Sequence, residues 1–171
     1  KTVVLHNALR GFTPLNQTTG FIDNPITSEK ITTWVNAYSK AIAALEESGK
    51  RVVFVIDNPT LPDPSSCISG DMTPFAWLNK FIYRNVNPYC TVQYSDHIKG
   101  TAPYQEFLKH LQAANPSLVV FDPLPELCDI PNNICTYAEG GNFLYSYGDH
   151  ISDYAGSKIA RELLPLIRKQ K

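Results

Sequence analysis

The stretch Arg51-Val52-Val53-Phe54-Val55-Ile56 decides the fold of this chain. It is a short apolar run rich in β-branched residues, and it ends at Asp57-Asn58-Pro59, where proline blocks the continuation of a strand. Such a run is typical of a strand that is covered on both faces. Two further stretches, Thr2–His6 and Ser117–Phe121, have the same character, so we predict three buried strands.

Amphipathic segments alternate with these strands. Between residues 28 and 47, apolar side chains recur every three or four positions, which predicts a helix that is capped by Thr27 or Ser28 and followed by Gly49. Alternating strands and helices indicate an α/β fold with a mostly parallel sheet and helices on both faces. We predict three further helices and one short strand, at residues 74–85, 103–114, 153–168 and 91–94.

Polar residues follow each of the three predicted strands. Asn7 comes after the first strand, Asp57-Asn58 after the second and Asp122 after the third. In open parallel sheets, ligands bind outside the carboxyl ends of the strands. These residues are therefore candidates for a site by position alone.

The composition excludes several classes of function. The chain has 171 residues, which fits one domain over residues 1–171. Its 15 Lys and Arg residues are balanced by 16 Asp and Glu residues, so there is no basic excess to neutralise the phosphates of a nucleic acid. No apolar run approaches the roughly 18 residues needed to cross a bilayer. We expect no nucleic-acid partner and no membrane span in this chain.

Four cysteines, Cys67, Cys90, Cys128 and Cys135, lie in loop-like sequence. No Cys-x-x-Cys spacing, no histidine pair at ligand spacing and no Gly-rich phosphate loop is present, so we expect neither a metal nor a cofactor. We favour two local disulfides, Cys67–Cys90 and Cys128–Cys135, each worth about 2–4 kcal/mol. Disulfides imply an oxidising compartment, such as the periplasm. The alternative is four buried free thiols.

The segment Phe143–Gly156 is the most informative stretch for function. It places His150 just before a predicted helix start, with Ser152 or Asp153 as the N-cap. A loop histidine held at a helix N-terminus is suited to act as a general base. The alternative is a surface histidine beside a helix cap. Gly-x-Ser-x-Gly and Gly-Asp-Ser are both absent, so no serine-nucleophile motif accompanies His150.

The other three histidines are weaker candidates. We expect His97 in a loop, His110 on the solvated side of a helix, and His6 at the end of the first strand, in the core or at a site. That first strand begins almost at residue 1, yet it has the composition of a central strand. Because sheets of this kind usually have about five or six strands, we infer that the chain is the C-terminal part of a larger α/β domain.

The end of the chain resembles a known family. Leu144-Tyr145, Asp149-His150-Ile151-Ser152 and Gly156 are similar to the last block of SGNH-type (GDSL-type) hydrolase domains. They resemble in particular the domains fused to the C-terminus of acyltransferase-3 family membrane O-acyltransferases. The order of the upstream elements also fits, including a pair of cysteines just before the final block. The resemblance covers nearly the whole chain and is specific in that block.

The resemblance implies a three-layer α/β/α sandwich and a Ser-His hydrolase or transferase. His150 would take the proton from a serine nucleophile. In such domains the serine lies in the first strand-loop block, which is missing here, so it would lie outside this chain. Asn7 matches an oxyanion-hole donor in position.

The chain departs from the family at the triad aspartate. The family's aspartate lies three residues before the histidine, where this chain has Tyr147. Asp149 is adjacent to His150, and neighbouring side chains in a loop rarely meet in triad geometry. Either a dyad operates, a backbone carbonyl orients the imidazole, or the site is degenerate.

Two functions follow from the resemblance. The first is an extracytoplasmic domain, tethered to the inner membrane by an upstream transmembrane domain, that transfers or hydrolyses O-acyl groups such as acetyl on a cell-surface glycan. A membrane acyltransferase domain would deliver the acyl donor, and this chain alone would be inactive. The second is a catalytically inactive module of the same fold that binds a glycan or a partner protein. A third reading, a flavodoxin-like or sensory domain, explains neither the cysteines nor the block around His150.

Overall fold

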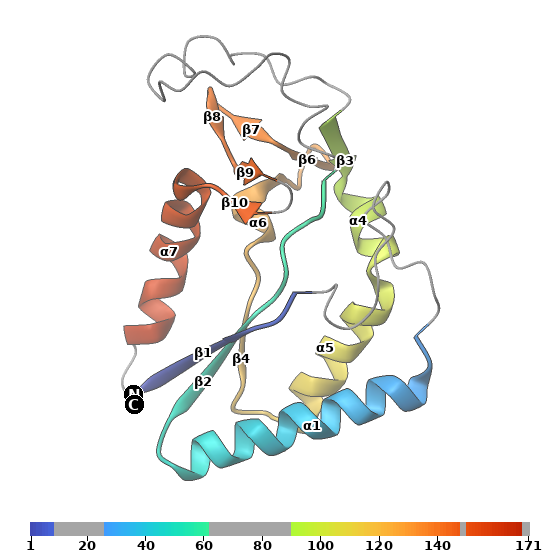
Figure 1. Ribbon diagram of the computed structural model, residues 1–171, viewed down its shortest axis with the longest axis vertical. Helices are drawn as coiled ribbons and strands as arrows, with labels where there is room; N and C mark the ends of the chain where they lie inside the picture. Colours follow the sequence, from blue (N-terminus) through green and yellow to red (C-terminus); the bar gives the residue numbers. More distant parts are fainter. Residues whose placement is uncertain (9–25, 62–89, 148–149, 169–171) are drawn as a thin grey trace.

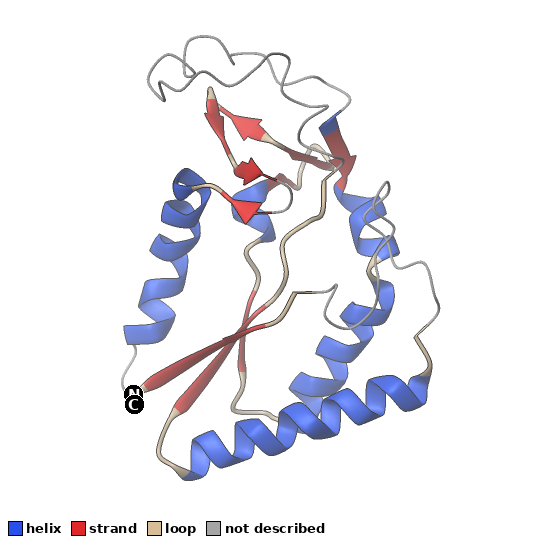
Figure 2. Cartoon of the chain, in the orientation of Figure 1, coloured by secondary structure: helices blue, strands red, loops and turns tan. Residues whose placement is uncertain are grey.

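The structure, a computed structural model, has one parallel sheet with helices and a set of small hairpins (Figures 1 and 2). It describes residues 1–8, 26–61, 90–147 and 150–168.

The central sheet consists of three parallel strands in the order β1-β2-β4: β1 (Thr2–His6), β2 (Arg51–Val55) and β4 (Val119–Phe121). Their register places His6 opposite Val55 and Val55 opposite Phe121, so the three carboxyl ends lie level with one another. The middle of β2 is fully buried, as the apolar run that forms it predicts.

Helix α1 (Ser28–Glu47) has the bounds that its apolar spacing predicts. The Oγ1 of Thr27 accepts the N–H of Lys30 at 3.3 Å, which satisfies one of the free donors at the helix start. Gly49 follows the helix with φ +74°, a left-handed conformation that suits glycine, and its N–H donates to the Glu46 carbonyl at 2.8 Å.

Helix α5 (Ala102–Ala114) packs against α1 and provides the centre of the core. The ring of Phe107 is fully buried and meets the rings of Trp34, Tyr38 and Phe54 edge to face, with centroids 5.5–6.4 Å apart. These contacts join α1, α5 and β2 into one apolar unit.

Helix α7 (Asp153–Arg168) also has its predicted bounds, and it lies on the side of the strands away from α1 and α5 (Figure 1). It buries Ala155 and Ile159. Near its end, the carbonyl of Ile167 accepts the hydroxyl of Thr2 at 2.9 Å, which joins the helix to the start of β1. Among the described residues, no helix is long and apolar enough to cross a membrane.

Small antiparallel sheets lie beyond the carboxyl ends of β2 and β4 (Figure 1). Apart from the strand at residues 91–94, the sequence does not predict these strands, because segments of two or three residues carry almost no periodic signal. The strand predicted at residues 91–94 exists but pairs antiparallel with β6 instead of joining the parallel sheet. The elements are β3 (Thr91–Gln93), α6 (Leu124–Leu127), β5 (Cys128–Asp129), β6 (Ile134–Thr136), β7 (Ala138–Glu139), β8 (Asn142–Phe143), β9 (Tyr145–Tyr147) and β10 (His150–Ile151).

The three cysteines within the described residues form disulfides. Cys128 and Cys135, the pair expected from the sequence, stand directly opposite each other on β5 and β6 and form a disulfide with a Cα–Cα distance of 4.1 Å. Cys90 is also disulfide-bonded, and Cys67, its expected partner, lies outside the described residues. The alternative of four free thiols is therefore wrong.

The prediction of a loop at His97 is wrong. His97 belongs to α4 (Tyr94–Gly100) and is only 7% exposed. A residue far away in the sequence caps the start of this helix: the side-chain oxygen of Asn133 accepts the N–H of Ser95 at 2.8 Å. Burial lowers the pKa of His97 to about 4, so its imidazole is neutral near pH 7. The sequence of residues 94–100 does not predict this helix start, because the capping side chain comes from Asn133.

The expectation that β1 is covered on both faces is also wrong for the part of the chain that is described. There β1 is the edge strand, and Val4 is 41% exposed. An apolar run indicates that a strand suits burial, but it does not say which element covers it. The helix predicted at residues 74–85 lies outside the described residues.

Candidate functional site

The carboxyl ends of the three parallel strands bring the predicted polar residues to one edge of the sheet. Asn7 directly follows β1, Asp57-Asn58 follow β2, and Asp122 directly follows β4. Since the strands are in register at this end, the edge forms one polar zone.

His6 and Asp57 come together in this zone. The Nε2 of His6 lies 4.0 Å from Oδ1 of Asp57, and its Nδ1 lies 3.2 Å from the carbonyl oxygen of Val55. The side chain of His6 is 50% exposed, whereas that of Asp57 is only 14% exposed. The sequence shows both residues as polar positions at strand ends, but only the register of β1 against β2 reveals that they lie together.

Two buried tyrosines stand near the same carboxylate. Burial raises the pKa of Tyr104, and the charge of Asp57 raises it further. Burial also raises the pKa of Tyr145, with a smaller contribution in the same direction from Asp57 and an opposing one from the side chain of Asn58. Both phenols therefore stay protonated near neutral pH.

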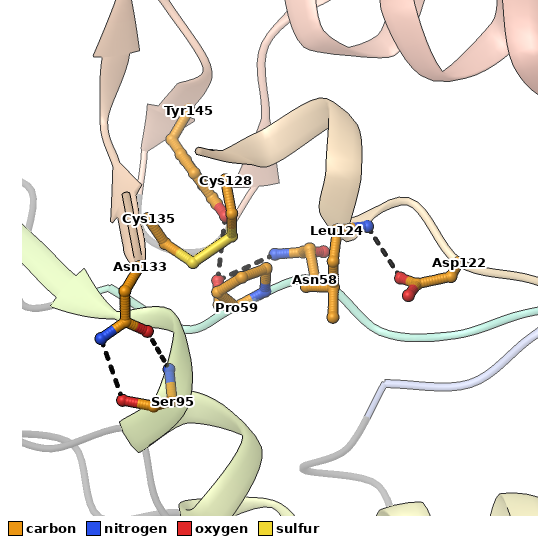
Figure 3. The surroundings of a disulfide bond; sticks show 9 residues. All are labelled: Asn58, Pro59, Ser95, Asp122, Leu124, Cys128, Asn133, Cys135 and Tyr145. Atoms are coloured by element: carbon orange, nitrogen blue, oxygen red, sulfur yellow. Dashed lines mark hydrogen bonds between the residues drawn. A yellow bond between two sulfur atoms is a disulfide. The ribbon is translucent and has the colours of Figure 1, made fainter. Parts of the chain in front are cut away.

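Asp122 has a local role in the structure. Its Oδ1 accepts the N–H of Leu124 at 2.8 Å, which turns the chain from β4 into α6 (Figure 3). Burial raises the pKa of the Asp122 carboxyl, and this hydrogen bond partly opposes the shift.

His150 lies on a separate hairpin made by β9 and β10. It is exposed and pairs with Tyr147, while Ile151 pairs with Tyr145. The Oγ of Ser146 donates to the backbone carbonyl of His150 at 3.3 Å. The hairpin thus holds the backbone of His150 and leaves its side chain accessible.

Ser152 closes the base of this hairpin. Its hydroxyl donates to the Phe143 carbonyl at 2.5 Å, and its N–H donates to the Leu144 carbonyl at 2.9 Å. The same hydroxyl oxygen accepts the N–H of Ala155 at 3.2 Å, so Ser152 is the N-cap of α7. The sequence leaves Ser152 and Asp153 open as caps, and the structure selects Ser152.

Tyr145 joins the hairpin to the edge of the parallel sheet. The residue is only 2% exposed, and its hydroxyl donates to the Pro59 carbonyl at 3.2 Å. Figure 3 shows the amide of Asn58 pointing at the same oxygen, at 3.3 Å, with the Cys128–Cys135 disulfide beside them. The carboxyl end of β2 and the hairpin that carries His150 therefore form one connected structure.

The first turns of α7 are anchored by charged groups. The Nζ of Lys158 donates to Oε1 of Glu139 at 2.6 Å and to the Glu126 carbonyl at 2.9 Å. The hydroxyl of Tyr154 donates to the same Oε1 of Glu139 at 3.1 Å. These bonds hold the helix that follows His150 against α6 and the β7–β8 hairpin.

Neither residue that the sequence discusses as a possible partner of His150 can be placed beside its side chain. Asp149 lies outside the described residues, and of Tyr147 only the backbone pairing is described. Within the described ranges, no group of three or more His, Cys, Asp or Glu side chains is arranged to hold a metal ion.

A parallel sheet with flanking helices, and with polar residues gathered at its carboxyl edge, defines an α/β domain of the hydrolase-like kind. The family model described as "SGNH domain (fused to AT3 domains)" matches residues 1–165, so the chain belongs to this family. This confirms the resemblance drawn from the final block around His150. Neither the curated proteins nor the solved structures gave a match. The membership indicates an acyl-transfer or hydrolase-like function, with an AT3 domain as the membrane partner.

Proposed function

We propose that this domain transfers or hydrolyses O-acyl groups, such as acetyl, on a cell-surface glycan outside the cytoplasm. An AT3 domain in the membrane would tether it and deliver the acyl donor. The observation that carries the proposal is the family match over residues 1–165, which includes the block with His150. The disulfide at Cys128–Cys135 supports an oxidising compartment such as the periplasm.

In this proposal, His150 is the general base and the nucleophile is a serine outside these 171 residues. His150 takes the serine proton as the hydroxyl oxygen attacks the acyl carbonyl, and it returns that proton to the departing oxygen. The side-chain amide of Asn7 donates a hydrogen bond to the oxyanion that forms. The exposure of His150 and the bonds that Ser152 and Tyr145 make around its hairpin support this role.

The free side of β1 supports a serine from elsewhere. Among the described residues, no strand pairs with the outer edge of β1. A further parallel strand on this edge would pair with the backbone of β1 and bring its own carboxyl end beside Asn7. The complete domain would then be a three-layer α/β/α sandwich.

The proposed mechanism lacks the carboxylate that orients the histidine in a catalytic triad. Tyr147 stands where the family has aspartate, and Asp149 is adjacent to His150. With neither in triad geometry, a Ser-His dyad or a backbone carbonyl would orient the imidazole. Loss of the orienting carboxylate costs about 10⁴ in rate in a serine protease triad.

The residue at position 147 also supports a second candidate function. Tyr147 in place of the acid favours a catalytically inactive module that binds a glycan or a partner protein. Such a module would keep the hairpin and the polar edge of the sheet as binding surfaces without any activated serine.

Labelling with a fluorophosphonate probe separates the two functions. The samples are the longer protein with its AT3 domain, the same protein with His150→Ala, and this chain alone. We expect the longer protein to label, and the His150→Ala variant to label roughly 10²–10⁴-fold more slowly. His110→Ala is the matched control, because His110 is an exposed histidine on α5.

The other outcomes are equally informative. Labelling of this chain alone would show that the nucleophile lies within it. An unlabelled longer protein would overturn the enzymatic function and favour the binding module. Labelling that does not depend on His150 would remove this residue from the role of base.

A further inference from the structure

Ser152 forms hydrogen bonds on both sides of the junction between β10 and α7. Its hydroxyl donates to the Phe143 carbonyl at 2.5 Å, and its N–H donates to the Leu144 carbonyl at 2.9 Å. On the helix side, its hydroxyl oxygen accepts the N–H of Ala155 at 3.2 Å, and its carbonyl accepts the N–H of Gly156 at 2.8 Å. Ser152 thus joins the segment that leads into β9 to the first turn of α7.

These bonds close the stretch of chain that carries His150. Phe143 and Ser152 are nine positions apart, and the bond between them brings the two ends of the β9–β10 hairpin together. The pairing inside the hairpin is irregular at the histidine, because the register of the two strands shifts between His150 and Ile151. The place of His150 therefore depends on the closed base of the hairpin as well as on the pairing of its strands.

The two bonds of the Ser152 hydroxyl make different demands on the side chain. A hydroxyl has one proton to donate and can also accept, so serine bonds to Phe143 and caps α7 at the same time. Capping alone does not require a hydroxyl, because glycine is only slightly worse than serine at a helix start. The bond to Phe143 does require a donor, and it joins the hairpin rather than the helix.

We propose that Ser152 is a positioning residue for His150, and that its hydroxyl bond to Phe143 sets where the imidazole lies. The inference rests on the proposed function, in which His150 is the general base. A base must lie within hydrogen-bond reach of the proton that it takes, and a misplacement of about 1 Å can cost about 10² in rate. In this role Ser152 acts only through His150.

The test uses three substitutions at this position in the longer protein with its AT3 domain. Ser152→Thr keeps the donor and the cap, Ser152→Ala removes both, and Ser152→Gly removes the donor but still caps α7. We expect the rate of fluorophosphonate labelling per folded molecule to fall about tenfold or more for both alanine and glycine. The threonine variant should label at nearly the normal rate, although the alanine variant alone should be clearly less stable.

Three controls separate positioning from stability. Thr27→Ala removes the N-cap of α1, so it should lower stability without slowing labelling. Ser157→Ala makes the same change at an exposed serine on α7 and should alter neither. In the His150→Ala background, Ser152→Ala should have no further effect on labelling, because a positioning residue acts through the histidine.

Labelling rates that follow the stabilities of the three variants would overturn the inference and show that Ser152 only caps α7. So would an effect of Ser152→Ala that persists in the His150→Ala background.

An unlabelled longer protein would overturn the proposed function, and NMR of this chain then decides the inference separately. Ser152→Ala and Ser152→Gly should shift the ring signals of His150, whereas Ser152→Thr and Ser157→Ala should leave them in place. Unchanged His150 ring signals in the alanine and glycine variants would show that the hydroxyl of Ser152 does not place the imidazole.

Discussion

Two regions of this molecule are held together by different forces. The parallel sheet with α1 and α5 is held by buried apolar side chains, with Phe54 and Phe107 fully buried at its centre. The hairpins over residues 124–152 are held by a disulfide and by hydrogen bonds between side chains and distant backbone groups, such as Tyr145 to Pro59. The first region follows from a local pattern, whereas the second follows from particular pairs of residues.

The largest effect should come from the core. Phe107→Ala removes the ring that contacts Trp34, Tyr38 and Phe54, and we expect it to destabilise the domain by about 3–5 kcal/mol. Urea unfolding of the variant and of Lys109→Ala, an exposed neighbour on α5, measures the difference. A loss below about 1 kcal/mol would mean that the parallel-sheet region does not depend on this aromatic cluster.

This contrast explains how much the sequence predicts. The bounds of α1 and α7 follow from apolar spacing and caps, and β2 follows from a single apolar run, because these signals are local. The polar edge of the sheet is predictable for the same reason, since Asn7 and Asp57 simply follow strands.

The remaining features depend on contacts across the chain. The start of α4, the helix that carries His97, is capped by Asn133, and the pairing of His6 with Asp57 depends on the register of two strands. The hairpin of His150 is fastened by Tyr145 to Pro59, 86 residues away in sequence. A single sequence identifies these residues as polar or aromatic but does not say which of them meet.

Lowering the pH should weaken the junction between the two regions, where α4 meets β3. The pKa of His97 is about 4 in the folded protein, below the ordinary value of 6.5. The unfolded chain therefore binds a proton that the folded one does not, and stability falls as the pH drops from 6.5 towards 4. The loss attributable to His97 is about 3 kcal/mol.

Stability curves of the wild type and of His97→Gln between pH 7 and 4 measure this loss. The wild type should lose more stability over this range than the variant, which carries no titrating group at position 97. His110→Gln, at an exposed histidine, should follow the wild type. Parallel curves for the wild type and His97→Gln would show that His97 is not buried in its neutral form.

The disulfide should matter less, and mainly in the hairpin region. Replacing Cys128 and Cys135 together by serine should cost about 2 kcal/mol, because the closed loop is short. Hydrogen exchange should rise at β5 and β6 and stay unchanged in α1 and α5. Equal acceleration in both regions would contradict the view that the hairpins are stabilised separately from the apolar core.

The smallest change in stability, and the most specific one, should come from Tyr145→Phe. It removes the hydroxyl bound to Pro59 but keeps the ring that packs edge to face on Tyr137, so we expect a loss of about 1 kcal/mol. If the hydroxyl sets the place of His150, the variant of the longer protein should also label more slowly with a fluorophosphonate. Tyr137→Phe, which removes a hydroxyl from the other ring of the pair, should label at the normal rate.

The decisive comparison for Tyr145 uses the His150→Ala background. A positioning role acts through His150, so Tyr145→Phe should slow labelling when His150 is present and have no further effect when it is absent. A general loss of folded protein would instead slow labelling by the same factor in both backgrounds. That result would show that the bond from Tyr145 to Pro59 stabilises the fold but does not position His150. The contact between the hairpin and the edge of the sheet would then have no role in the reaction.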